Sequence, residues 1–141
     1  MKKFIKALII VLVVIIVILF AAYLYFINMP DKNVSKMKPD FQVTASELSQ
    51  EYESEPEKAD KKYIDNIVEV TGTITEISKD QNDSFVFILK QEESETGVLC
   101  TLSQENDKKA SSYKTGDKVT IRGTCSGMLF EVVLNKCAIV K

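Results

Sequence analysis

Apolar residues follow two different patterns along the chain. From Ala7 to Ile27 they form an unbroken run of 21 apolar or aromatic positions. A run of about 20 such residues is long enough to cross the hydrocarbon layer of a membrane as a helix. Beyond residue 43, apolar residues alternate with polar ones over long stretches, which is typical of half-buried strands. These patterns predict a single transmembrane helix over residues 1–27, followed by a mainly β domain.

The flanks of the apolar run indicate an uncleaved signal anchor. The run is longer than the h-region of a cleaved signal peptide, which spans about 7–15 residues, and no Ala-x-Ala site or nearby cysteine follows it. Lysines lie on both sides, so a simple count does not decide the orientation. The three lysines at positions 2, 3 and 6 are the more concentrated, and we expect the N-terminus in the cytoplasm and the domain outside it.

One long strand organises the β domain. Val68, Val70 and Ile74 alternate with polar residues between positions 67 and 77, and Gly72 interrupts the apolar positions. A glycine inside a strand commonly marks a bulge or a sharp bend. A long strand that bends can pair with one neighbour before the bend and with another after it. The pattern therefore predicts a small closed barrel.

Shorter patterns complete the predicted domain. Four more strands are expected at 84–90, 97–102, 119–123 and 129–134, with a polar turn at 78–83, a Ser-Gly turn at 126–127 and a possible turn of helix within 103–113. Thr44 and Glu47 fit a capping box that begins a short helix, and Pro56 can begin a second one. The expected organisation is a tether over 28–42, a helical appendage over 43–64 and a five-stranded barrel over 65–141.

Composition limits the chemistry that this domain can perform. Removing the three N-terminal lysines leaves 15 basic residues against all 20 acidic ones, a net formal charge of −5. The chain has no histidine, which excludes Ser-His-Asp and Cys-His catalysis and every metal site that contains histidine. Cys100, Cys125 and Cys137 allow at most one internal disulfide, and three buried free cysteines are an equal alternative. We expect no catalysis, no metal site and no cofactor.

An ordered set of residues after the tether resembles a known family. The set comprises Thr44, Ala45, Glu47, Leu48, Tyr52, Ala59, Asp60, Tyr63, Val68, Val70, Gly72, Gly116, Asp117, Val119, Ile121, Gly123, Cys125, Gly127 and Cys137. In this order the residues resemble the tRNA-anti-like family of OB-fold domains, which is common in membrane-attached or secreted bacterial proteins. The resemblance implies an OB-fold barrel. It does not imply tRNA binding, because many unrelated functions occur on one fold.

OB-fold barrels usually bind ligands on their second and third strands and on the loops after the first and fourth. The candidate binding residues in those places are Lys79, Phe85, Phe87, Arg122 and Met128. The two phenylalanines share a strand face with Leu89, which is more typical of a barrel core.

Binding to single-stranded nucleic acid requires a basic groove with aromatic platforms. Arg122 is the only arginine, and the domain is acidic. We therefore expect a membrane-anchored, extracytoplasmic module that binds an envelope protein or a glycan, with a protein joined by strand addition at an open barrel edge slightly preferred. Nucleic-acid binding is the alternative.

Overall fold

The computed structural model describes residues 1–28, 33–92 and 94–140. The chain divides into two compact units, Met1–Lys32 and Asn33–Lys141. The first unit contains helix α1 (Lys2–Ile27), whose 26 residues span about 39 Å at 1.5 Å per residue. None of its side chains is buried, and its length and composition are sufficient to cross a membrane. The predicted apolar helix is therefore present.

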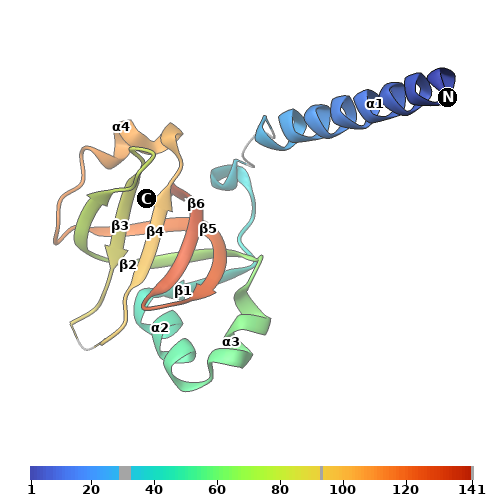
Figure 1. Ribbon diagram of the computed structural model, residues 1–141. Helices are drawn as coiled ribbons and strands as arrows, with labels where there is room; N and C mark the ends of the chain where they lie inside the picture. Colours follow the sequence, from blue (N-terminus) through green and yellow to red (C-terminus); the bar gives the residue numbers. More distant parts are fainter. Residues whose placement is uncertain (29–32, 93, 141) are drawn as a thin grey trace. The chain divides into compact units, whose positions relative to one another are not determined.

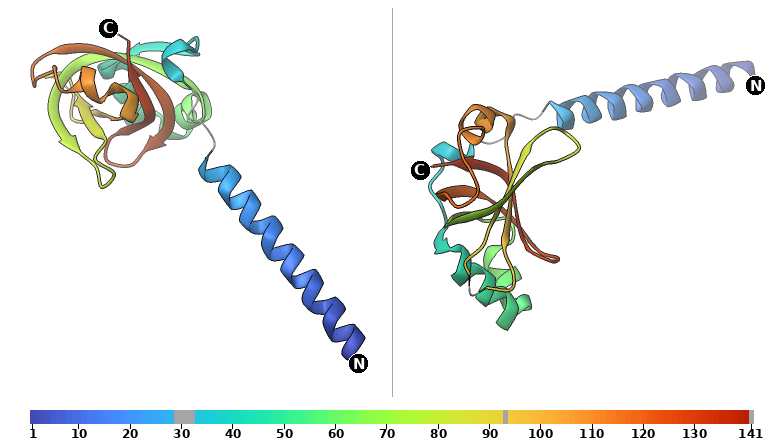
Figure 2. Two further views of the ribbon diagram at one scale, coloured as in Figure 1. Left: turned by 90° about the horizontal axis from the view of Figure 1, so that it is seen from above. Right: turned by 90° about the vertical axis from the view of Figure 1, so that its left-hand side faces the viewer.

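The second unit is built around a barrel (Figures 1 and 2). Its strands are β1 (Phe41–Thr44), β2 (Ile67–Lys79), β3 (Phe85–Leu89), β4 (Val98–Leu102), β5 (Lys118–Met128) and β6 (Val132–Ile139). The strand order is β1-β2-β3-β4-β6-β5, and pairing of β2 with β5 closes strands β2 to β6 into a barrel. This closure confirms the predicted five-stranded OB fold.

Strand β1 is an addition that the sequence did not reveal. It runs parallel to β2, with Phe41 opposite Val68 and Thr44 opposite Thr71. Four residues are too few to show a clear alternation, and the predicted boundary at residue 42 divided them between the tether and the helical appendage. The chain is also structured before β1, because Val34–Lys36 forms the short 3-10 helix η1 and the side chain of Val34 is buried.

The bend in β2 lies where Gly72 predicted it. Residues 67–73 pair with β5 and residues 74–79 pair with β3, with a register shift between Ile74 and Glu76. A Cβ atom on Gly72 would lie 2.9 Å from Cβ of Ala45 and 3.2 Å from Cβ of Leu89. Gly72 therefore allows a helix and a neighbouring strand to approach β2 closely at the bend.

Helices α2 (Ala45–Ser54) and α3 (Pro56–Tyr63) cover one end of the barrel (Figure 1). The backbone N–H of Glu47 donates to Oγ1 of Thr44, and the backbone N–H of Thr44 donates to Oε2 of Glu47, at 3.2 and 2.8 Å. This is the predicted capping box. Pro56 begins α3, also as predicted. At the opposite end lie the 3-10 helix η2 (Gln104–Asn106) and helix α4 (Asp107–Ala110).

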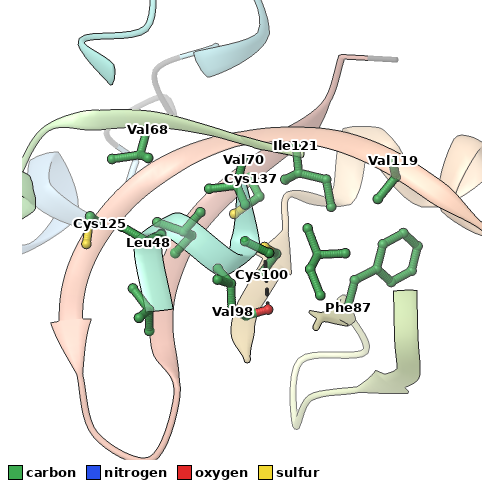
Figure 3. Packing of buried hydrophobic residues seen from close by; sticks show 14 of the residues in the cluster. Leu48, Val68, Val70, Phe87, Val98, Cys100, Val119, Ile121, Cys125 and Cys137 are labelled. Atoms are coloured by element: carbon green, nitrogen blue, oxygen red, sulfur yellow. Dashed lines mark hydrogen bonds between the residues drawn. The ribbon is translucent and has the colours of Figure 1, made fainter. Parts of the chain in front are cut away.

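The barrel interior is apolar and contains all three cysteines (Figure 3). Cys100, Cys125 and Cys137 are buried free thiols. Burial and the neighbouring Cys100 thiol raise the pKa of Cys137 well above its usual value. The structure therefore contains the arrangement of three buried free cysteines.

The last hairpin differs from the prediction. Ser126 and Gly127 do not form its turn but lie within β5, where the register shifts between Cys125 and Met128. The hairpin turns at residues 129–131, and β6 begins only at Val132. A Ser-Gly pair can mark either a turn or a bulge. Here the positive φ of Gly127, 97°, belongs to the bulge.

Candidate interaction surface

Of the five predicted binding residues, Phe87 lies deepest in the barrel. Its side chain has no exposed surface, and its ring packs against those of Phe85 and Tyr113, with centroids 6.5 and 6.1 Å away. Phe85 is only partly buried. Phe87 occupies an inward-facing position on β3, and its side chain therefore presents no surface to a ligand.

Lys79 and Phe85 flank the β2–β3 turn, which satisfies its own polar groups. Nζ of Lys79 lies 2.9 Å from Oδ1 of Asp83 and 4.8 Å from the centre of the Phe85 ring. Oδ1 of Asp80 accepts hydrogen bonds from the backbone N–H groups of Asn82 and Ser84, at 2.8 and 3.0 Å. The turn is therefore a self-contained polar element.

Arg122 is engaged by the barrel itself. It lies opposite Glu69 in the β2–β5 register, and its Nε donates to Oε2 of Glu69 at 3.0 Å. Its Nη1 donates to the backbone carbonyls of Ser35 and Met37. The guanidinium group therefore fastens the segment before β1 to the barrel. This role was not predicted from the sequence. The available signal was one arginine and one glutamate on two predicted strands.

Met128 leads into the most exposed apolar side chains of the described barrel unit. Leu129 is 83% exposed and Phe130 is 95% exposed, at the turn between β5 and β6. The turn holds one internal backbone hydrogen bond, from N–H of Leu129 to the carbonyl of Glu131 at 3.2 Å. It lies at the same end of the barrel as α2 and α3, whereas the β2–β3 turn lies at the opposite end, the end that carries α4 (Figure 1). The predicted binding residues are therefore not gathered into one site.

The neighbouring strands β3, β4 and β6 also carry outward-facing aliphatic side chains. Ile88 on β3 pairs with Leu99 on β4, and Leu99 pairs with Val133 on β6. All three are partly exposed, whereas their neighbours along each strand point into the core. Ile88, Leu99, Leu129, Phe130 and Val133 are called the hydrophobic surface below.

Carboxylates border the hydrophobic surface. A Cβ on Gly127 would lie 3.3 Å from Oδ1 of Asp60, and one on Gly97 would lie 3.7 Å from Oε1 of Glu131. Oε1 of Glu53 accepts a hydrogen bond from the backbone N–H of Thr96 at 3.1 Å. These three acidic residues, Glu53, Asp60 and Glu131, are called the acidic border.

The acidic border is joined to the core through Tyr52. Its hydroxyl lies 3.5 Å from Sγ of Cys125. Burial raises the pKa of Tyr52, and both Cys125 and the Asp60 carboxylate raise it further. Among residues 1–28, 33–92 and 94–140, no group of three histidine, cysteine, aspartate or glutamate residues is arranged to hold a metal ion.

Comparison with protein families decides where this chain belongs. The family model tRNA_anti-like matches residues 1–139. The chain belongs to the tRNA_anti-like family. No curated protein matches the chain by sequence.

Solved structures extend the comparison of this tRNA_anti-like chain. A proposed nucleic acid-binding lipoprotein from Klebsiella pneumoniae subsp. pneumoniae MGH 78578 is 21% identical, with a TM-score of 0.62 over 79% of this chain and 98% of that one. The S. pombe Stn1-ten1 complex is 18% identical, with a TM-score of 0.42 over 53% of this chain and 58% of that one. Asparaginyl-tRNA synthetase from Pyrococcus horikoshii is 11% identical, with a TM-score of 0.41 over 57% of this chain and 21% of that one. The first likeness concerns the fold alone.

Of the residues in and next to the hydrophobic surface of this tRNA_anti-like chain, only Met128, which directly precedes Leu129, was predicted from the sequence as a binding residue. Leu129 and Phe130 were assigned to the fifth strand, where a core position would be expected. The signal that could have identified them is the Gly-Met-Leu-Phe-Glu segment itself, in which the apolar residues follow one another without alternation.

Proposed function

We propose that this chain is a membrane-anchored, extracytoplasmic OB-fold module that binds an envelope protein through the hydrophobic surface. The observation that carries the proposal is the near-complete exposure of Leu129 and Phe130 at the end of a paired hairpin. Burying a side chain of this kind contributes about 1.5–3 kcal/mol relative to leaving it in water. Binding hot spots are typically a few large side chains at the centre of an interface.

A partner that binds the exposed side chains fits this barrel better than a partner strand that pairs with the first half of β2. Strand β1 already pairs with residues 68–71 of β2, and β5 pairs with the other edge of the same segment. A partner strand would therefore have to displace part of this chain there. The exposed side chains of the β5–β6 turn require no such rearrangement.

A protein ligand also fits this surface better than a glycan. Oligosaccharides are oriented by polar groups that form hydrogen bonds with their hydroxyls. Here carboxylates lie only at the border, and the most exposed side chains, Leu129 and Phe130, are apolar. An apolar protein surface would remove them from water without leaving polar groups unpaired.

Nucleic-acid binding is the alternative, and the first solved structure described above is a proposed nucleic acid-binding protein. In the present chain Lys79 pairs with Asp83, and Arg122 is held by Glu69 and by two backbone carbonyls. Using either side chain to bind phosphate would require breaking these contacts. The net negative charge of the domain also opposes binding to a polyanion.

Membrane attachment outside the cytoplasm is part of the proposal. Helix α1 is apolar enough to cross a membrane, and the Klebsiella protein of the same fold is a lipoprotein. Protease added to intact cells, with the outer layers made permeable where necessary, is expected to remove the barrel. A barrel that is digested only after the cytoplasmic membrane is lysed would contradict the extracytoplasmic placement. Titration of the full chain in micelles with single-stranded oligonucleotides would then test the alternative.

The partner is tested by chemical cross-linking in intact cells. The full chain is compared with a Leu129→Asp/Phe130→Asp variant and with a control variant, Lys109→Asp, whose exposed side chain lies on α4. We expect one envelope protein to be captured by the wild type and the control and lost from the double variant. Capture of the same proteins at the same yield by all three chains would contradict the proposal.

A further inference from the structure

The charges around the hydrophobic surface are not compensated within the described part of the chain. Other carboxylates, on α2 and β2, have cationic partners: Glu51 pairs with Lys62, and Glu69 pairs with Arg122. In contrast, no lysine or arginine among residues 33–92 and 94–140 forms an ion pair with Glu53, Asp60 or Glu131. The hydrophobic surface is therefore bordered by negative charge that remains available to a partner.

The acidic border lies along the β5–β6 hairpin and the loop before β4. Asp60 lies against Gly127 at the base of the hairpin, while Glu131 directly follows Phe130 and approaches Gly97. Glu53 reaches the same loop through its hydrogen bond with Thr96. An approaching surface that covers the hairpin from Gly127 to Glu131 and the loop at Thr96 and Gly97 would therefore meet these carboxylates.

On the basis of the proposed function, we infer that the partner is a protein with an apolar pocket for Leu129 and Phe130 whose edge carries lysine or arginine side chains. Complementary charges accelerate association and disfavour incorrect partners. The same acidic border argues against two other occupants. Anionic lipid headgroups attract basic segments and repel acidic ones. A symmetric contact with a second copy would bring two identical acidic borders together.

The test places a photoreactive p-benzoyl-phenylalanine at position 130 of the full chain in intact cells, because this residue preserves the aromatic ring. Adduct yield is compared between a Glu53→Gln/Glu131→Gln background and a Glu76→Gln/Glu105→Gln background. Both double variants remove two negative charges, but Glu76 and Glu105 are exposed residues outside the acidic border.

We expect a protein adduct that maps to apolar residues flanked by lysine or arginine. Its yield should fall about fivefold or more when the acidic border is neutralised and should remain unchanged in the control background. Equal yields in the two backgrounds, or an adduct on a surface without basic residues, would overturn this inference but leave the proposed function standing. An adduct with lipid or with a second copy of the chain would overturn both, as would the absence of any adduct.

Discussion

The turns at the two ends of the barrel use their residues in opposite ways. In the β2–β3 turn, Asp80 binds two backbone N–H groups and Lys79 pairs with Asp83. In the β5–β6 turn, Leu129 and Phe130 project into solvent, and the carboxylates around them have no cationic partner among the described residues. The first turn closes a hairpin and satisfies its own groups. In the second turn the exposed apolar side chains and the nearby carboxylates can contact a partner.

The largest expected effect comes from making the apolar turn polar. The Leu129→Asp/Phe130→Asp variant should bind the partner at least about 30-fold more weakly, because two anchor side chains are replaced by charges in a desolvated contact. Its free energy of unfolding should change by less than about 0.5 kcal/mol, since both side chains are exposed. Partner affinity and urea unfolding of the full chain in micelles provide the two measurements. An unfolding change larger than the binding change would assign these residues to the fold instead.

In the β2–β3 turn, substitutions should lower the stability of the fold and leave partner affinity unchanged. Asp80→Ala should lower the free energy of unfolding by about 1–2 kcal/mol, because two backbone N–H groups lose their acceptor. Asp80→Asn retains the oxygen acceptor and should cost less. Urea unfolding measures both variants, and partner affinity should remain at the wild-type value in each. Loss of partner binding with Asp80→Asn would show that the two turns are not separate in function.

The bulge before the apolar turn gives a smaller effect with a matched control. Gly127 and Gly116 both have a positive φ, 97° and 96°. A Cβ at Gly127 would lie 3.3 Å from Oδ1 of Asp60, whereas one at Gly116 would have no atom within 4 Å. Each alanine variant should destabilise the fold by about 1 kcal/mol through its backbone conformation. Gly127→Ala should cost more than Gly116→Ala, and equal unfolding free energies would show that the Asp60 contact is unimportant.

The smallest effect is expected at Lys79. Its ion pair with Asp83 is largely exposed, and exposed pairs contribute about 0–1 kcal/mol. Lys79→Ala should therefore leave both partner affinity and oligonucleotide binding unchanged in titrations of the full chain. A marked loss of oligonucleotide affinity would instead favour the nucleic-acid alternative.

The sequence predicted the framework well because backbone requirements leave local signals. Gly72 marked the bend of β2, Thr44 and Glu47 marked the start of α2, and Pro56 marked the start of α3. Strand β1 was missed because a four-residue parallel strand is stabilised by its pairing with residues 68–71, which are remote in sequence. The structured segment around Val34 was missed for the same reason, since it depends on Arg122.

The candidate surface was harder to predict than the fold. Phe87 and Phe130 are the same residue type, yet one is fully buried and the other almost fully exposed. Strand alternation correctly favours the core for Phe87. For Phe130 the result depends on where β5 ends, and the bulge at Gly127 shifts that end by several residues. Charge counting likewise identified an acidic domain but could not show which carboxylates lack a cationic partner.

Whether the β5–β6 turn binds a protein partner is tested by comparing the two turns in the same intact cells. Photoreactive p-benzoyl-phenylalanine is placed in the full chain either at position 130 or at position 82, where Asn82 is exposed in the β2–β3 turn. We expect a single protein adduct from position 130 and none from position 82. Equal adducts from both positions, or no adduct from position 130, would contradict this expectation.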